Sequence, residues 1–257
     1  MPVANLQSYR SVALSVRSTA FASQGTAMQL EAALTGQLQQ KCGFATIHRP
    51  DGSPVDVMID LNIVNTGRGG GRVWSNSSEA YVDTLLVLTD GPTGDLMGTA
   101  KIRGKSSGMI INGAPPENEA IAITAQTIAN LLAKSGCSGP RIARTEPTKP
   151  TDTTTPSPPV QGQPPIDESK RPEAEKLNED GKMKLRTADV NGALANFQQA
   201  VQLIPDGRYQ YNVCLAYETL EQWPTAIDAC KKARAMTTEQ RLIEKIDHRL
   251  DLLAAHQ

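Results

Sequence analysis

A pattern of small residues recurs after 33 residues in the last third of the chain, and this repeat is the feature that most limits the fold. The two copies share small residues on one helical face: Ala193, Phe197 and Ala200 in the first, and Ala226, Cys230 and Ala233 in the second. A period of this length is typical of repeat proteins whose unit is a pair of helices. Small residues at these positions let paired helices approach closely. We therefore expect residues 174–257 to form an all-α domain of about two helix pairs, capped by a further helix over residues 239–255.

The first helix of the second copy resembles the tetratricopeptide-repeat (TPR) family. Its segment Tyr211–Trp223 is similar to the Tyr-Asn-Leu-Gly-x-Ala-Tyr stretch of that family, and Pro205 closes the first copy as proline closes such repeats. Three positions depart from the family pattern: Cys214 replaces a usual glycine, Glu221 replaces the turn glycine, and Lys184 replaces a large aromatic residue. The resemblance implies a module that binds proteins or peptides.

In the TPR family, the side chains that contact peptides come from the first helix of each repeat. Carried over to this chain, those positions are Asn178, Lys182, Arg186, Tyr211, Asn212, Leu215 and Thr219. Amide and cationic side chains together can hold a backbone amide or a carboxylate. The alternative is that these side chains simply face water.

A proline-rich stretch separates this module from the rest of the chain. Residues 145–173 hold eight of the 17 prolines and show no apolar periodicity. Such a segment cannot bury enough apolar surface to offset its ordering entropy, and its prolines favour a semi-extended spacer. We interpret it as a linker; the alternative is a proline-rich ligand for a partner domain.

The region before the linker, residues 8–144, predicts an α+β domain. Strands are expected over residues 12–16, 44–49, 55–64, 81–89 and 96–103, because apolar and polar residues alternate or form short apolar runs there. Helices are expected over residues 23–40 and about 121–132, where apolar residues recur at helical spacing. Tight turns between the later strands indicate an antiparallel or mixed sheet with the helices on one face.

This order of elements resembles the amino-terminal domains of the TolB type. The opening strand Val12–Val16 and a helix leading into Cys42 and Phe44 carry the resemblance, which also extends to envelope lipoproteins of the curli-secretion type. It implies a noncatalytic assembly domain in the periplasm or at the outer membrane. The chain start has no apolar signal region, so the protein is either cytoplasmic or has a signal segment or lipid anchor upstream of this sequence.

The cysteines divide evenly between the two predicted domains. Cys42 and Cys137 each end a predicted helix, which is compatible with a disulfide in an oxidising compartment. Buried free thiols are the alternative. For Cys214 and Cys230, the residues favour two small buried side chains over a disulfide.

Motifs for catalysis or cofactor binding are weak throughout. The segment from Gly67 to Arg72 is rich in glycine, but it lacks the lysine of a phosphate loop and no helical pattern follows it. Asp56 and Asp60 alternate on one strand, where we expect a solvated face. The net charge of -1 argues against nucleic acid as a partner. We therefore expect no enzyme activity, cofactor, metal or small-molecule substrate.

Together these features predict a noncatalytic protein of the bacterial cell envelope that tethers two protein partners, one through each domain. The alternative is a cytoplasmic TPR scaffold or chaperone-like adaptor. The partners and the oligomeric state are not indicated by the sequence.

Overall fold

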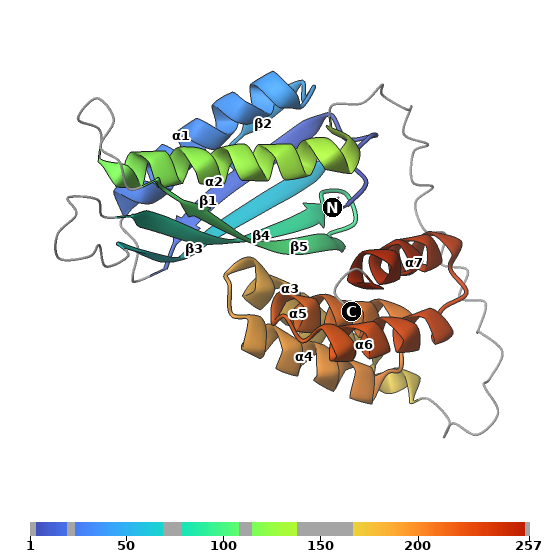
Figure 1. Ribbon diagram of the computed structural model, residues 1–257. Coiled ribbons are helices and arrows are strands. Elements are labelled where there is room, and N and C mark those ends of the chain that lie inside the picture. Colours follow the sequence, from blue (N-terminus) through green and yellow to red (C-terminus); the bar gives the residue numbers. More distant parts are fainter. Residues whose placement is uncertain (1–3, 20–23, 69–78, 108–114, 138–166, 255–257) are drawn as a thin grey trace. The chain divides into compact units, whose positions relative to one another are not determined.

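The computed structural model describes residues 4–19, 24–68, 79–107, 115–137 and 167–254, and these residues form two compact units (Figure 1). The first unit spans Met1–Ile142 and the second spans Ala143–Gln257. Most of the predicted linker, up to position 166, lies outside the described residues. Helical structure begins at Glu168, earlier than the predicted boundary at residue 174.

A five-stranded mixed sheet organises the first unit. Its strands are β1 (Ser11–Ser18), β2 (Thr46–His48), β3 (Val57–Arg68), β4 (Ala80–Asp90) and β5 (Leu96–Lys105), in the spatial order β2-β1-β3-β4-β5. β1 is parallel to both β2 and β3, whereas β3, β4 and β5 pair antiparallel. The α+β class and the mixed sheet predicted from the sequence are confirmed.

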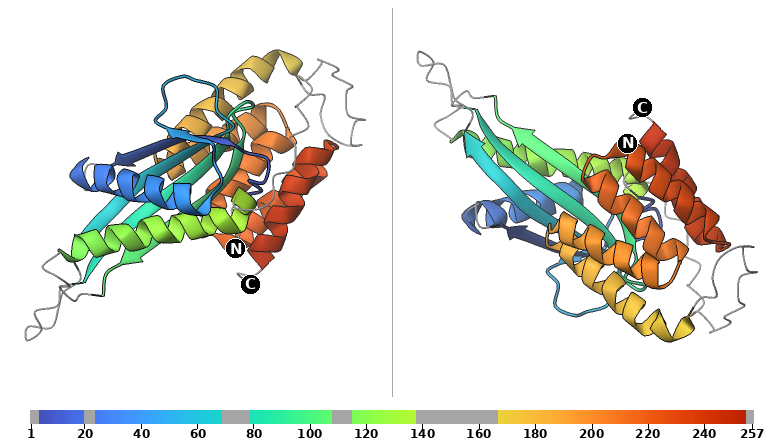
Figure 2. Two further views of the ribbon diagram at one scale, coloured as in Figure 1. Left: turned by 90° about the horizontal axis from the view of Figure 1, so that it is seen from above. Right: turned by 90° about the horizontal axis from the view of Figure 1, so that it is seen from below.

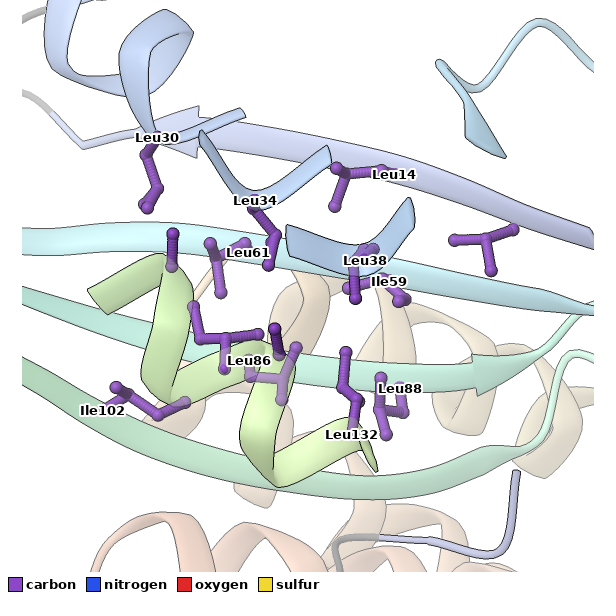
Figure 3. Packing of buried hydrophobic residues seen from close by; sticks show 14 of the residues in the cluster. Leu14, Leu30, Leu34, Leu38, Ile59, Leu61, Leu86, Leu88, Ile102 and Leu132 are labelled. Atoms are coloured by element: carbon purple, nitrogen blue, oxygen red, sulfur yellow. The ribbon is translucent and has the colours of Figure 1, made fainter. Parts of the chain in front are cut away.

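Two helices cover one face of this sheet. They are α1 (Gln24–Lys41) and α2 (Pro116–Leu132), which lie side by side across the strands (Figures 1 and 2). The core lies between this helix layer and the strands, where Leu34 and Leu38 of α1 meet Ile59 and Leu86 of the sheet (Figure 3). These are the residues that recur at helical spacing or alternate along the strands. Burial of this apolar set is the main force that holds the unit together.

The two helices end together at a covalent link. Cys42 follows α1, and Cys137 ends the short irregular turn Ala133–Cys137 that continues α2; their sulfurs form a disulfide. Gly136 makes this ending feasible, because its φ of 95° lies in the left-handed region that favours glycine. The backbone N–H of Gly43 also donates to the carbonyl oxygen of Cys137 at 3.0 Å.

The expectation of a solvated face around Asp56 and Asp60 is wrong. Asp60 is 2% exposed and lies 3.6 Å from the guanidinium of Arg17 on the neighbouring strand β1. Asp56 precedes β3 and accepts hydrogen bonds from the backbone N–H groups of Arg10 and Ser11. The two carboxylates therefore have separate structural partners.

The second unit consists, in its described residues, of helices. A short 3-10 turn (Glu168–Lys170) leads into α3 (Arg171–Arg186), which pairs with α4 (Val190–Leu203); α5 (Gly207–Thr219) pairs with α6 (Trp223–Ala235), and α7 (Gln240–Ala254) follows. Gly181 lets α3 approach α4, since a Cβ at this position would lie 2.5 Å from the ring of Phe197. Asp189 caps α4 by accepting from the N–H of Gly192.

The turns inside the two helix pairs have the same backbone geometry. Ala188 and Glu221, which lie 33 residues apart, both have positive φ, of 66° and 61°. The N–H of the next residue, Asp189 or Gln222, donates back to the carbonyl oxygen of Lys184 or Tyr217 respectively. The 33-residue recurrence in the sequence thus corresponds to a recurring turn. Glu221 adopts this conformation although glycine suits it best.

Candidate interaction surface of the helical unit

The predicted binding residues lie along two helices of the second unit. Asn178, Lys182 and Arg186 follow one another at four-residue spacing on α3, so they share a face of that helix. The other four, Tyr211, Asn212, Leu215 and Thr219, lie on α5.

One contact joins the two sets. Asn212 donates from Nδ2 to Oδ1 of Asn178 at 2.7 Å, and both side chains are buried, at 4% and 3% exposure. Lys182 is also buried along its stem, and its Nζ lies 2.8 Å from the carboxylate of Glu179. Arg186 is half-buried at the end of α3. These four polar side chains, which we call the polar line, are Asn178, Lys182 and Arg186 of α3 and Asn212 of α5.

Two of the predicted residues have structural roles inside α5. Leu215 is completely buried, so its side chain contributes packing. The hydroxyl of Thr219 donates to the carbonyl oxygen of Leu215 at 2.7 Å, one turn back in the same helix.

A buried arginine of α7 extends the polar line, and the sequence reasoning missed it. Arg249 is 2% exposed, and its Nη1 lies 3.1 Å from Oε1 of Glu218 on α5. It also interacts with the hydroxyl of Tyr211. The sequence could have indicated this buried arginine, because Arg249 lies on the same side of α7 as the apolar residues Leu242, Ile246 and Leu253.

Burial and neighbouring charges shift the pKa values of Tyr211 and Arg249. Burial raises the pKa of Tyr211, and the neighbouring Arg249 only partly offsets that effect. Burial alone would lower the pKa of Arg249, but Glu218 and Tyr211 outweigh it and the pKa of Arg249 is raised. The guanidinium is therefore a permanent cation in this face.

Both pairs of cysteines are bonded within their own units. Cys42 is joined to Cys137, and Cys214 of α5 is joined to Cys230 of α6, so all four cysteines of the chain are paired. The expectation of buried thiols at Cys214 and Cys230 is wrong. Their Cα atoms lie 5.1 Å apart because the two helices pack closely, which is the usual spacing for a disulfide.

We also searched the described residues for a metal site, a membrane-spanning helix and a phosphate-binding loop. They contain no group of three or more His, Cys, Asp or Glu side chains placed to hold a metal ion. Within the same part of the chain, no helix combines the length and apolar character needed to span a membrane. In the glycine-rich segment, Gly67 and Arg68 belong to β3 and Arg68 pairs with Glu117; residues 69–72 lie outside the described ranges.

Comparisons with known proteins give partial structural similarities only. Neither a protein-family model nor a curated protein matches the sequence. The chain is similar to the PelC dodecamer from Paraburkholderia phytofirmans, with 11% identity and a TM-score of 0.41, over 54% of this chain and 96% of that one. It is also similar to a lipoprotein from Neisseria meningitidis, with 10% identity and a TM-score of 0.34, over 49% and 99% of the two chains. A minor lipoprotein from Acinetobacter baumannii gives 14% identity and a TM-score of 0.32, over 49% and 94%.

Proposed function

We propose that this protein is a noncatalytic interaction protein of the bacterial cell envelope, which tethers two protein partners. The α+β unit would bind one partner, and the helical unit, as a TPR module, would bind the other. The observation that carries the binding role is the polar line on α3, α5 and α7, built around the hydrogen-bonded pair Asn178 and Asn212. Lys182 and Arg186 add positive charge along α3, which suits a peptide carboxylate.

The disulfides support an oxidising compartment. Cysteines in a reducing cytoplasm stay mostly as thiols, whereas disulfides persist in the periplasm and outside the cell. Pairing of all four cysteines, each within its own unit, therefore favours the envelope over a cytoplasmic scaffold.

The location can be tested by trapping thiols in intact cells. Cells would be quenched with acid, and the protein labelled under denaturing conditions with a maleimide that adds mass to each free thiol. The envelope proposal expects no labelled cysteine without a reductant and four after reduction. Labelling of all four before reduction would support the cytoplasmic alternative.

The binding face can be tested by neutralising its cations in pairs. Bait protein would be cross-linked in a solubilised envelope fraction of the source cell, and captured proteins would be quantified by mass spectrometry. We expect Lys182→Gln with Arg186→Gln to reduce capture of a specific protein by about tenfold, as loss of charge-assisted hydrogen bonds requires. Lys231→Gln with Lys232→Gln, on exposed positions of α6, is the matched control. Equal capture by both double variants would remove this face from the proposal.

A further inference from the structure

The outward face of the α1–α2 layer carries little charge, and exposed Lys134 lies at its edge, just after α2. Glu31 and Lys41 are the only charged residues of α1, and α2 has none after Glu119. Both charges of α1 are engaged inside the unit: Glu31 binds Arg49, and Nζ of Lys41 donates to Asn130 of α2. The opposite layer differs, since the strands carry ion pairs such as Arg103 with Asp83. Depletion of charge is a mark of the centre of protein interfaces.

Neutral polar and apolar side chains occupy this face. Gln29, Ala32 and Gln39 of α1 and Gln126 of α2 are exposed, and α1 and α2 lie side by side so that they form one surface (Figure 2, left). Met28 beside them is 64% exposed, which is the highest value among the large apolar side chains of the described residues. An exposed methionine next to uncharged neighbours is typical of a contact surface.

Gly36 lies in the middle of the outward face of α1, and the fold of the unit does not explain why a glycine is found there. Apart from the backbone of its own helix, a Cβ added at Gly36 would meet none of the described atoms within 4 Å, so their packing does not require glycine. Glycine in a helix interior is destabilising compared with alanine. Its presence is explained if another backbone comes close to α1 at this point.

We propose that this face, centred on Ala32 and Gly36, is a self-association surface that binds the same face of a second copy. A two-fold contact brings each residue near its own counterpart, so a charged face would repel itself. Glutamine side chains avoid this problem, because each amide is both donor and acceptor and can pair with an identical amide. A neutral, glutamine-rich face therefore suits a second copy better than it suits a charged partner.

The size of the face sets the expected strength. An 18-residue helix is about 27 Å long, so two adjacent helices present roughly 500 Å². A stable interface buries about 800 Å² on each partner. The contact is smaller than that, and we expect a concentration-dependent equilibrium with a micromolar to millimolar dissociation constant.

A charge-reversal experiment tests the homotypic contact. Sedimentation equilibrium of the full chain would follow the average mass from about 1 µM to about 1 mM. We expect the mass to rise above the monomer value for the unchanged protein. Ala32→Arg and Ala32→Glu should each weaken association by about tenfold or more, and an equimolar mixture of the two should restore it. Ala195→Arg, at an exposed position of α4, is the matched control.

A second readout does not depend on the stability of these variants. A photoreactive phenylalanine placed at Gln126 should give a cross-linked dimer whose linked peptides both come from α1 or α2, whereas the same group at Ala195 should give none. Monomer mass over the whole range would overturn the proposal. So would an oligomer that keeps its mass in both Ala32 variants, since association would then use another surface.

Discussion

Asn212 donates a hydrogen bond to Asn178 at 2.7 Å across 34 residues of sequence, and both amides are buried. The bond links α5 to α3 and so joins the first helices of the two pairs. A buried amide that loses its partner keeps the cost of its desolvation. The pair is therefore both a connection within the helical unit and the centre of the proposed binding face.

Removing one member of this pair should destabilise the helical unit. We expect Asn212→Ala to lower the free energy of unfolding by about 1–3 kcal/mol, because the Oδ1 atom of Asn178 loses its donor. The double variant with Asn178→Ala should cost less than the sum of the single changes. Urea unfolding followed by circular dichroism measures both values. Asn191→Ala, at an exposed position of α4, is the control, and additive effects of the pair would argue against a direct bond.

Two glycine-to-alanine substitutions in the first unit, at Gly104 and Gly36, should change its stability in opposite directions. A Cβ at Gly104 would lie 2.0 Å from Oγ1 of Thr124 and 2.5 Å from the carbonyl oxygen of Ala120, so Gly104→Ala should destabilise by about 2–4 kcal/mol. Gly36→Ala, whose added Cβ would meet no described atom within 4 Å apart from the backbone of its own helix, should stabilise the monomer by about 0.5–1 kcal/mol. Thermal unfolding of dilute protein gives both signs, and destabilisation by Gly36→Ala would contradict the open helix surface.

The two disulfides should stabilise the units by constraining the unfolded chain. They close loops of very different length, with sequence separations of 95 for Cys42–Cys137 and 16 for Cys214–Cys230. Paired Cys→Ser substitutions should each cost about 2–5 kcal/mol, with the larger effect for Cys42 and Cys137 on the loop-entropy account. Hydrogen exchange resolved by peptide assigns each loss to its unit. Loss of protection in the other unit would show that the two are coupled.

The helical unit should lose stability at alkaline pH. Burial raises the pKa of Tyr211 above the value of about 10 of an exposed tyrosine, so the folded state keeps the proton longer than the unfolded state does. The stabilising effect is complete below pH about 10 and is lost as the pH rises through the folded-state pKa. Tyr211→Phe should flatten the fall in unfolding free energy between pH 10 and 11, because the variant lacks the hydroxyl that titrates. An unchanged slope in Tyr211→Phe would contradict this assignment.

The alternation of residues such as Ile59 and Leu61, and the helical spacing of Leu30, Leu34 and Leu38, predicted most of the first unit. Local periodicity was sufficient because one face of each element is buried in a common core. The same logic failed at Asp60, which is buried and lies 3.6 Å from Arg17 of another strand. It also failed at Cys214 and Cys230, because their bond depends on how closely α5 and α6 pack.

For the candidate binding face, the sequence placed Asn178, Lys182 and Arg186 on one side of a helix, since four-residue spacing alone decides that. It could not show that Asn178 and Asn212 meet or that Arg249 reaches Glu218 and Tyr211. Those contacts join residues 31 to 38 positions apart in the chain, and they form only when separate helices pack together. The sequence by itself determined which elements form and which of their faces are apolar; the tertiary structure decided which polar groups those faces bring together.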